Sequence, residues 1–172
     1  CKSCHAAASK GAQHSAWEKT KHAKAYETLA SPEAKKAGQA KGVDDPQKSD
    51  ACLKCHVTGH GVAAAQLPKK YDMAEGVQCE SCHGPGEKHV KARMKAAMGG
   101  ADPAVFQTIP DDELVKAPTY ETCVTCHNQE SPSFKPFCFK KRLEEIKHFD
   151  PRKTHAPDEI EKKACGCPDC KK

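Results

Sequence analysis

The sequence predicts one small domain whose core is formed by a group that its own side chains do not supply. Leu, Ile, Val and Phe account for 21 of the 172 residues, which at about 12 per cent is below the level at which a chain normally builds an apolar core. The same chain carries 12 cysteines and 10 histidines. These residues can hold a large apolar group covalently, so we expect the core to consist of such a group instead of side chains.

The decisive motif is Cys-x-x-Cys-His, which occurs four times. On one turn of helix, two cysteines three residues apart lie on the same face, so both can form thioether bonds with the vinyl groups of one haem. The following histidine then ligates the iron as a neutral imidazole. The sequence therefore predicts four covalently attached haem c groups with iron. The motifs are Cys1, Cys4 and His5; Cys52, Cys55 and His56; Cys79, Cys82 and His83; and Cys123, Cys126 and His127.

Dithiol redox chemistry and zinc binding each account for less of the pattern. A redox-active dithiol explains a single Cys-x-x-Cys but not the histidine after each of four, and a zinc site requires paired motifs. The motifs begin at residues 1, 52, 79 and 123, so their spacing is unequal, and one compact haem cluster is expected rather than a string of repeats. Haem attachment needs reduced thiols and a maturation system outside the cytoplasm. We therefore predict a periplasmic or extracellular protein.

The sixth iron ligands are expected among the six remaining histidines. Two imidazoles keep an iron six-coordinate and its reduction potential low, whereas an axial methionine raises the potential. Met94 and Met98 lie four residues apart on one helical face and are predicted to be packing residues. The remaining histidines, in chain order, are His14, His22, His60, His89, His148 and His155.

Local signals place three of these histidines on helices. A run with helical character extends from residue 14 to about 30 and contains His22, and a Ser-Pro pair stops it. His89 opens a second helix after a Gly-Pro-Gly turn, and His148 closes a third that spans residues 139–149. A histidine late on a helix can reach a neighbouring haem without disturbing an attachment loop. These three are therefore the best-placed ligands, and the other three are weaker candidates.

Three segments of the first half resemble the tetrahaem cytochrome c family of ammonia-oxidising bacteria, whose members accept electrons from hydroxylamine oxidoreductase. The segments contain a candidate distal histidine, the second motif and the turn after the third motif, so they are more specific than haem motifs alone. They are residues 17–25, WEKTKHAKA; residues 52–59, CLKCHVTG; and residues 76–86, GVQCESCHGPG.

The resemblance implies a mainly α fold, that of a small multihaem cytochrome with a haem-filled core, short helices, long loops and little or no sheet. Its haems would form stacked pairs along one chain of electron transfer. The resemblance also implies that His22 and His89 are distal ligands of haems attached elsewhere in the sequence, and that the third distal ligand, best matched by His148, comes from the C-terminal part. In the family the second haem, here the one on His56, is five-coordinate, and the presence of His60 leaves its state open in this chain.

The predicted function is electron transfer between a redox protein donor and a redox protein acceptor, with no catalytic residues. One alternative is a subunit of an extracellular nanowire, because related tetrahaem cytochromes polymerise into conducting filaments in which a histidine of the next subunit completes one haem. His14 or His155 would be that donor. The other alternative is a haem enzyme that reduces nitric oxide or a related small nitrogen species at a five-coordinate haem.

Charge and hydropathy exclude two further classes of partner. The formal net charge of +5 does not predict nucleic-acid binding, because four haems bring their own propionates and lower the net charge to about +1 in the oxidised protein. No stretch approaches the roughly 18 consecutive apolar residues of a membrane helix. We therefore expect neither nucleic-acid binding nor a membrane span.

Four cysteines belong to no haem motif, namely Cys138, Cys165, Cys167 and Cys170. Their number is even, so two disulfides are expected in an oxidising compartment, one of which ties Cys138 to the tail. A four-thiolate metal site and free thiols remain alternatives. Residues 1–150 are predicted to form the tetrahaem domain and residues 151–172 a Cys-rich tail, and residues 99–118 are predicted to be an irregular connection with one short turn or helix near 111–116.

Overall fold

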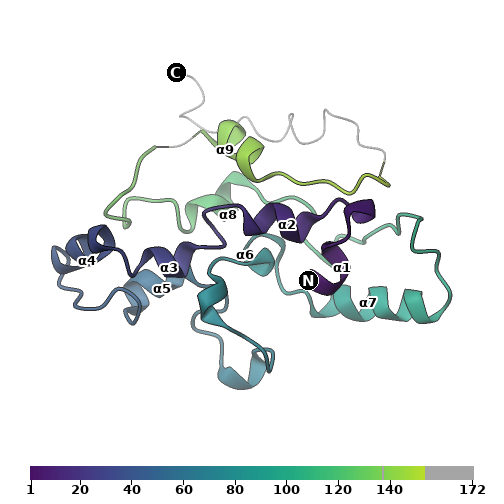
Figure 1. Cartoon of the computed structure of the whole chain (residues 1–172), viewed down its shortest axis with the longest axis horizontal. Coiled ribbons are helices and arrows are strands. Elements are labelled where there is room, and N and C mark those ends of the chain that lie inside the picture. Colours follow the sequence, from purple (N-terminus) through teal and green to yellow (C-terminus); the bar gives the residue numbers. More distant parts are fainter. Residues whose placement is uncertain (137, 154–172) are drawn as a thin grey trace.

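The regular secondary structure of the described residues consists of short helices joined by turns and loops. A computed structural model describes residues 1–136 and 138–153 (Figure 1), and these residues contain helices, turns and loops but no strand. The expectation of a mainly α fold without sheet is confirmed. The helices are α1 (Lys2–His5), η1 (Ala8–Lys10), α2 (Gln13–Glu18), α3 (Ala25–Thr28), α4 (Pro32–Gln39), α5 (Asp50–His56), η2 (Ala64–Gln66), η3 (Met73–Glu75), α6 (Cys79–His83), α7 (Glu87–Met98), α8 (Tyr120–Val124) and α9 (Phe139–Ile146).

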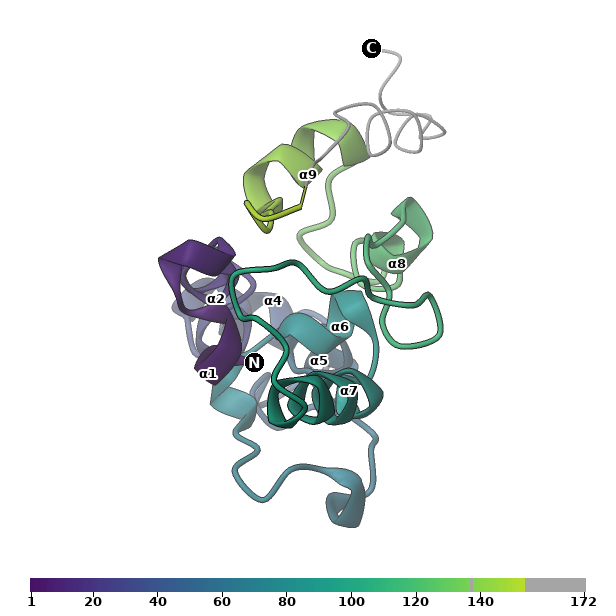
Figure 2. The ribbon, with the colours of Figure 1, turned by 90° about the vertical axis from the view of Figure 1, so that its right-hand side faces the viewer.

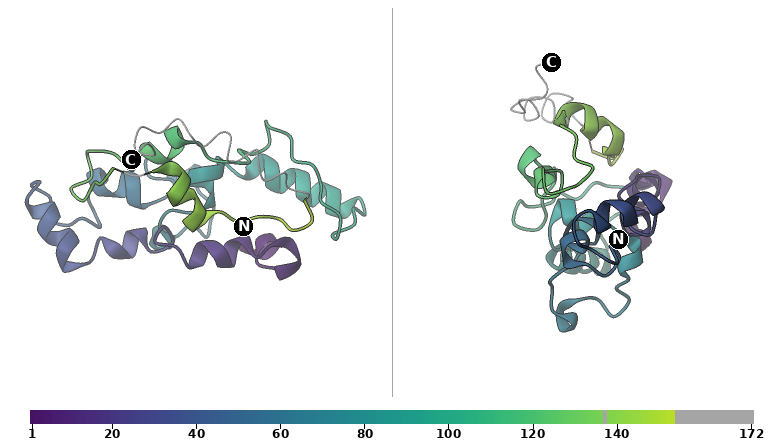
Figure 3. Two further views of the ribbon diagram at one scale, coloured as in Figure 1. Left: turned by 90° about the horizontal axis from the view of Figure 1, so that it is seen from above. Right: turned by 90° about the vertical axis from the view of Figure 1, so that its left-hand side faces the viewer.

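The molecule is elongated, with α4 at one end and α7 at the other (Figure 1). Seen from above, helices α1 to α4 run along one side, and α5, α6 and α7 lie along the other (Figure 3). Helices α8 and α9 cover these rows from one side, while the loop that carries η2 protrudes on the opposite side (Figure 2). Helix α3 joins the two rows, because it contacts both α5 and η3.

The predicted helix over residues 14–30 is divided in two, and His22 lies in the turn between α2 and α3. The backbone N–H of Val77 donates to the carbonyl oxygen of His22 at 3.0 Å, and the indole Nε1 of Trp17 donates to the carbonyl oxygen of Val77 at 2.8 Å. Gly76 makes this approach possible, because a Cβ there would lie 2.7 Å from the His22 oxygen. A tertiary contact therefore interrupts the helix.

The other predicted helices agree with the structure in type and differ at their ends. Helix α7 begins at Glu87, two residues before His89. Helix α9 ends at Ile146 because Lys147 takes an extended conformation, so His148 lies beyond the helix that it was expected to close. Residues 111–116 form a turn but no helix. No helix in the described ranges combines the length and apolar character needed to cross a lipid bilayer.

The polypeptide supplies very little core of its own. Among the described residues, the buried hydrophobic side chains are Leu29, Val57 and Phe139. Phe139 of α9 packs against Tyr120 of α8 with ring centroids 6.4 Å apart, and Leu143 completes this small cluster. The scarcity of apolar residues in the sequence therefore corresponds to a structure in which few apolar side chains are buried among the described residues.

Candidate haem-attachment and axial-ligand site

Each Cys-x-x-Cys-His motif starts on or beside a helix of four to seven residues. The second motif lies within α5 and the third forms α6. The first motif begins at the N-cap of α1, and the fourth continues past the end of α8. None of the eight motif cysteines is in a disulfide, so the paired thiols of every motif are available for other bonds. The four motifs thus present the two thiols and the imidazole that covalent haem requires.

Three motif histidines face a second histidine from a distant part of the chain. His5 lies opposite His89, His83 opposite His148 and His127 opposite His22, and the ring centroids of the three pairs are 6.1, 5.9 and 5.9 Å apart. Two imidazoles bound to opposite sides of one metal ion have centroids about 6 Å apart, since each metal–nitrogen bond is about 2 Å long and half a ring is added on each side. The three pairs therefore have the separation that a haem iron between them requires.

Four of the six paired histidines lie in surroundings that favour the neutral imidazole, the form that ligates iron. Burial lowers the pKa of His5, His22, His127 and His148 below that of a free histidine. These side chains are therefore uncharged near neutral pH, with a lone pair available on the ring.

For four of the eight motif thiols, burial shifts the pKa upward. Burial raises the pKa of Cys55 and of Cys123 to about 11, and it also raises the pKa of Cys79 and Cys82. A redox-active dithiol needs a thiol with a lowered pKa, since the thiolate is the nucleophile. The environment of these cysteines thus fits haem attachment better than dithiol chemistry.

Backbone carbonyl groups orient two of the motif histidines. The Nδ1 atom of His83 lies 2.7 Å from the carbonyl oxygen of Val115, and that of His56 lies 2.7 Å from the carbonyl oxygen of Ala25. A carbonyl oxygen can only accept, so Nδ1 carries the proton and Nε2 keeps its lone pair. Hydrogen bonds of this kind fix the tautomer and the ring orientation of metal-bound histidines.

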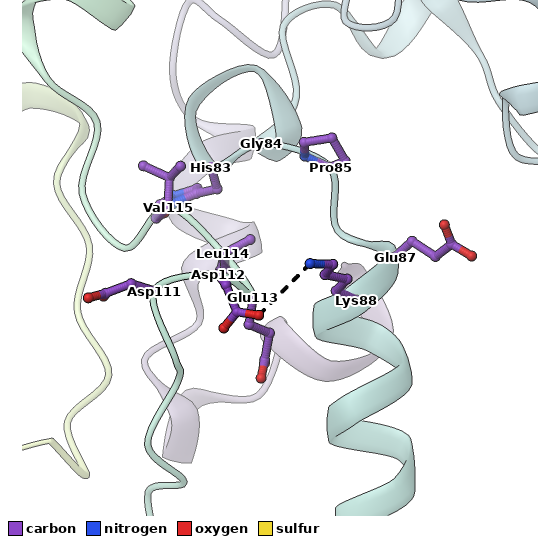
Figure 4. A pocket seen from close by; sticks show the side chains of 10 residues that line it. All are labelled: His83, Gly84, Pro85, Glu87, Lys88, Asp111, Asp112, Glu113, Leu114 and Val115. Atoms are coloured by element: carbon purple, nitrogen blue, oxygen red, sulfur yellow. Dashed lines mark hydrogen bonds and ion pairs between the residues drawn. The ribbon is translucent and has the colours of Figure 1, made fainter.

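A hollow of about 370 Å³ lies beside His83, between the start of α7 and residues 111–115 (Figure 4). Lys88 and Asp112 face each other across it, with 3.9 Å between Nζ and Oδ2. Val115, whose carbonyl oxygen contacts His83, is also part of its lining. The hollow therefore adjoins one of the three histidine pairs.

His56 has no histidine ring opposite it within the described parts of the chain. His60 turns instead to Asp50, whose Oδ1 lies 3.0 Å from the Nε2 atom of His60. His14 packs edge-on against Trp17 with ring centroids 5.1 Å apart, and its side chain is only 13 per cent exposed. His155 lies outside the described residues.

Contacts between neighbouring segments hold the second, third and fourth motifs together. The hydroxyl groups of Thr58, after the second motif, and Ser81, inside the third, are 2.5 Å apart. Lys54 inside the second motif forms an ion pair with Glu130, three residues after the fourth. These motifs therefore converge in space although up to 76 residues separate the paired side chains.

Some predicted roles take a different form in the structure. Met94 and Met98 were expected to pack, but their side chains are 60 and 81 per cent exposed. Both lie on α7, which is at one end of the molecule (Figure 1). Cys138 is disulfide-bonded, as the disulfide hypothesis predicts for it. The other three cysteines outside the motifs, Cys165, Cys167 and Cys170, lie outside the described residues.

The sequence gives no sign of the residues that support the candidate ligands. Glu113 is buried and lies 2.8 Å from the Nδ1 atom of His89, and Gln13 lies 3.3 Å from the Nδ1 atom of His5. Glu113 belongs to an irregular segment 24 residues from its partner. No motif or periodicity links the two, so only the fold brings them together.

The first 84 residues match the family model described as cytochrome c554 and c-prime. The chain is also 36 per cent identical over 147 residues to cytochrome c-554 of Nitrosomonas europaea, an alignment that covers 78 per cent of this chain. The chain is thus similar to the cytochrome c554 family over much of its length. These matches support a multihaem c-type cytochrome with covalently bound haem c, in agreement with the free motif thiols and the paired histidines.

A second relative is the multihaem cytochrome MtrA of Shewanella baltica. The two are 32 per cent identical over 99 residues, which is 53 per cent of this chain and 27 per cent of the relative. The alignment with the Nitrosomonas protein covers 58 per cent of that protein, so the chain spans less than two thirds of the relatives it matches. No solved structure matches the chain.

Proposed function

We propose that this chain carries single electrons through four covalently attached haems, of which three have two histidine ligands. The observation that carries the proposal is the set of three histidine pairs, whose ring centroids are 5.9 to 6.1 Å apart. Bound haem iron supplies the one-electron couple, and the chain supplies attachment, axial ligands and electrostatics.

The proposed ligand sets join distant parts of the chain. His5 and His89 ligate the first iron, His83 and His148 the third, and His127 and His22 the fourth. Two neutral imidazoles keep the coordination unchanged in both redox states and hold the reduction potential low. In each set a Cys-x-x-Cys-His motif provides one ligand, and a turn, the long helix α7 or the segment after α9 provides the other.

The proposal supports an assignment of partners and compartment. A protein without catalytic residues that holds several haems exchanges electrons with a redox protein donor and acceptor. Haem attachment takes place outside the cytoplasm, so we place the chain in the periplasm or the extracellular space.

The first test is the mass of the native protein. Mass spectrometry should show the chain mass plus four haems. A bare chain mass, or fewer than four haems on a fully occupied protein, would contradict the proposal.

The second test assigns the distal ligands. Exchange of histidine for methionine keeps an iron six-coordinate and raises its potential, so each of His22→Met, His89→Met and His148→Met should raise one of four midpoint potentials in a spectroelectrochemical titration. His60→Met is the matched control, because His60 contacts Asp50, and it should leave all four unchanged. A distal variant with four unchanged potentials would remove that histidine from the ligand set.

A second candidate function is binding and reduction of nitric oxide or a related small nitrogen species at the second haem. The observation that favours it is that no histidine in the described ranges faces His56, while the nearby His60 turns to Asp50. Carbon monoxide binding and a high-spin signal in electron paramagnetic resonance should then be seen for one haem in four. A purely low-spin spectrum without carbon monoxide binding would exclude this activity.

A further inference from the structure

Glu113 is the one buried acidic or basic residue in the described part of the chain, and it contacts a proposed axial ligand. Its side chain is 8 per cent exposed. One carboxylate oxygen, Oε1, lies 2.8 Å from the Nδ1 atom of His89, and the other, Oε2, lies 2.8 Å from Nη2 of Arg93. A buried charge is costly unless it is paired. Arg93 and His89 are the partners of this carboxylate, so the buried charge of Glu113 is tied to a proposed ligand.

Two separate elements build the contact. His89 and Arg93 lie four residues apart on α7, so both side chains are on the same face of that helix. Glu113 comes from the segment of residues 111–115 that runs beside α7 (Figure 4). Arg93 also donates to the carbonyl oxygen of Thr108 at 3.5 Å, which ties the helix to the same connection. The carboxylate is therefore held between the arginine and the histidine.

We propose that Glu113 is a positioning residue for His89 and lowers the reduction potential of the haem attached at Cys1 and Cys4. The inference rests on the proposed function, in which His89 is the distal ligand of that haem. A carboxylate that accepts the Nδ1 proton of a metal-bound histidine fixes the ring and makes the ligand more basic. A more basic ligand stabilises the ferric state, and the negative charge of Glu113 acts in the same direction.

The hydrogen-bond partners of three other paired histidines are uncharged. His5 contacts the amide of Gln13, His83 the carbonyl oxygen of Val115 and His148 that of Ile146. The carboxylate contact therefore distinguishes the first haem from the third. Arg93 moderates the effect, because its positive charge competes with His89 for the same carboxylate.

The test compares variants that remove the charge of Glu113 or the charge of its partner Arg93. Glu113→Gln keeps a hydrogen-bond acceptor of the same shape but removes the charge, so it should raise the midpoint potential of one haem. We expect about a tenfold change in the equilibrium between its ferric and ferrous states, which corresponds to about 59 mV for one electron. Arg93→Gln leaves the carboxylate to His89 alone and should lower the same midpoint potential. Arg93→Lys keeps the positive charge, so its midpoint potential should stay close to the wild-type value.

Two controls separate this inference from the ligand assignment. His89→Met identifies which of the four potentials belongs to the first haem, and Glu87→Gln removes a charge from a side chain on the same helix that is 76 per cent exposed and pairs with Lys91. Glu87→Gln should leave all four potentials unchanged. If His89→Met moves one potential but Glu113→Gln moves none, or if the Glu113 and Arg93 variants shift it in the same direction, the inference is wrong and the ligand assignment stands. If His89→Met moves none, the ligand assignment itself fails.

Discussion

Replacement of Phe139 by alanine should destabilise the contact between α9 and α8 and disturb the histidine that follows α9. Phe139 is 5 per cent exposed and packs against Tyr120, Cys123 and Leu143. Removal of a buried phenylalanine side chain costs about 3–5 kcal/mol, and the loss of the edge-to-face contact with Tyr120 accounts for about 1 kcal/mol beyond the area buried. The neighbours are only partly buried and can close over the gap. We therefore expect the lower part of this range, about 3 kcal/mol.

The change can be measured as a loss of free energy of unfolding in guanidinium chloride, followed by circular dichroism of the holoprotein. Phe139→Leu is the matched control, since it keeps most of the apolar volume and should cost less than about 1.5 kcal/mol. Because Phe139 anchors the helix that leads to His148, the alanine variant should also alter the low-spin spectrum of one haem. A loss below about 1 kcal/mol with an unchanged spectrum would show that the cluster around Phe139 does not hold α9 in place.

Three further substitutions test the contacts that shape the chain. Gly76→Ala should lower the free energy of unfolding by about 1–3 kcal/mol, because Gly76 has φ +67° and a Cβ would lie 2.7 Å from the His22 oxygen. The variant should also change the low-spin signal of one haem. Wild-type stability would refute the close approach. Trp17→Phe removes the donor to the Val77 carbonyl oxygen and should cost about 1 kcal/mol in denaturant unfolding, whereas no loss would show that the indole hydrogen bond is not needed. Thr119→Ala removes the cap of α8 and should also cost about 1 kcal/mol, with Thr119→Ser as a control that retains most of the stability.

The haem-attachment residues could be predicted because their chemistry is local. Two thiols and an imidazole within five residues are all on one turn of chain, so the spacing alone defines the motif. The sequence also singled out His22, His89 and His148, and the fold sets these three opposite a motif histidine, but their role as distal ligands stays a prediction. The pairing itself could not be read from the residues, because each pair joins segments that lie far apart in the chain.

The helix boundaries show where local signals fail. Residues 14–30 have helical character, yet the carbonyl oxygen of His22 accepts a hydrogen bond from Val77 and the helix stops. That interruption depends on a glycine more than 50 residues further along the chain. Propensity cannot register such a contact, because it is evaluated over neighbouring residues only.

By itself the sequence determined that this chain has four Cys-x-x-Cys-His motifs, too few apolar residues for a core of its own, and six histidines beyond those motifs. Only the tertiary structure decided which histidine faces which motif, that His56 has no such partner in the described residues, and that Glu113 meets His89. The physical reason is that thioether attachment depends on positions three residues apart, whereas axial ligation and its supporting hydrogen bonds depend on distances of a few ångströms between segments that the sequence separates by tens of residues.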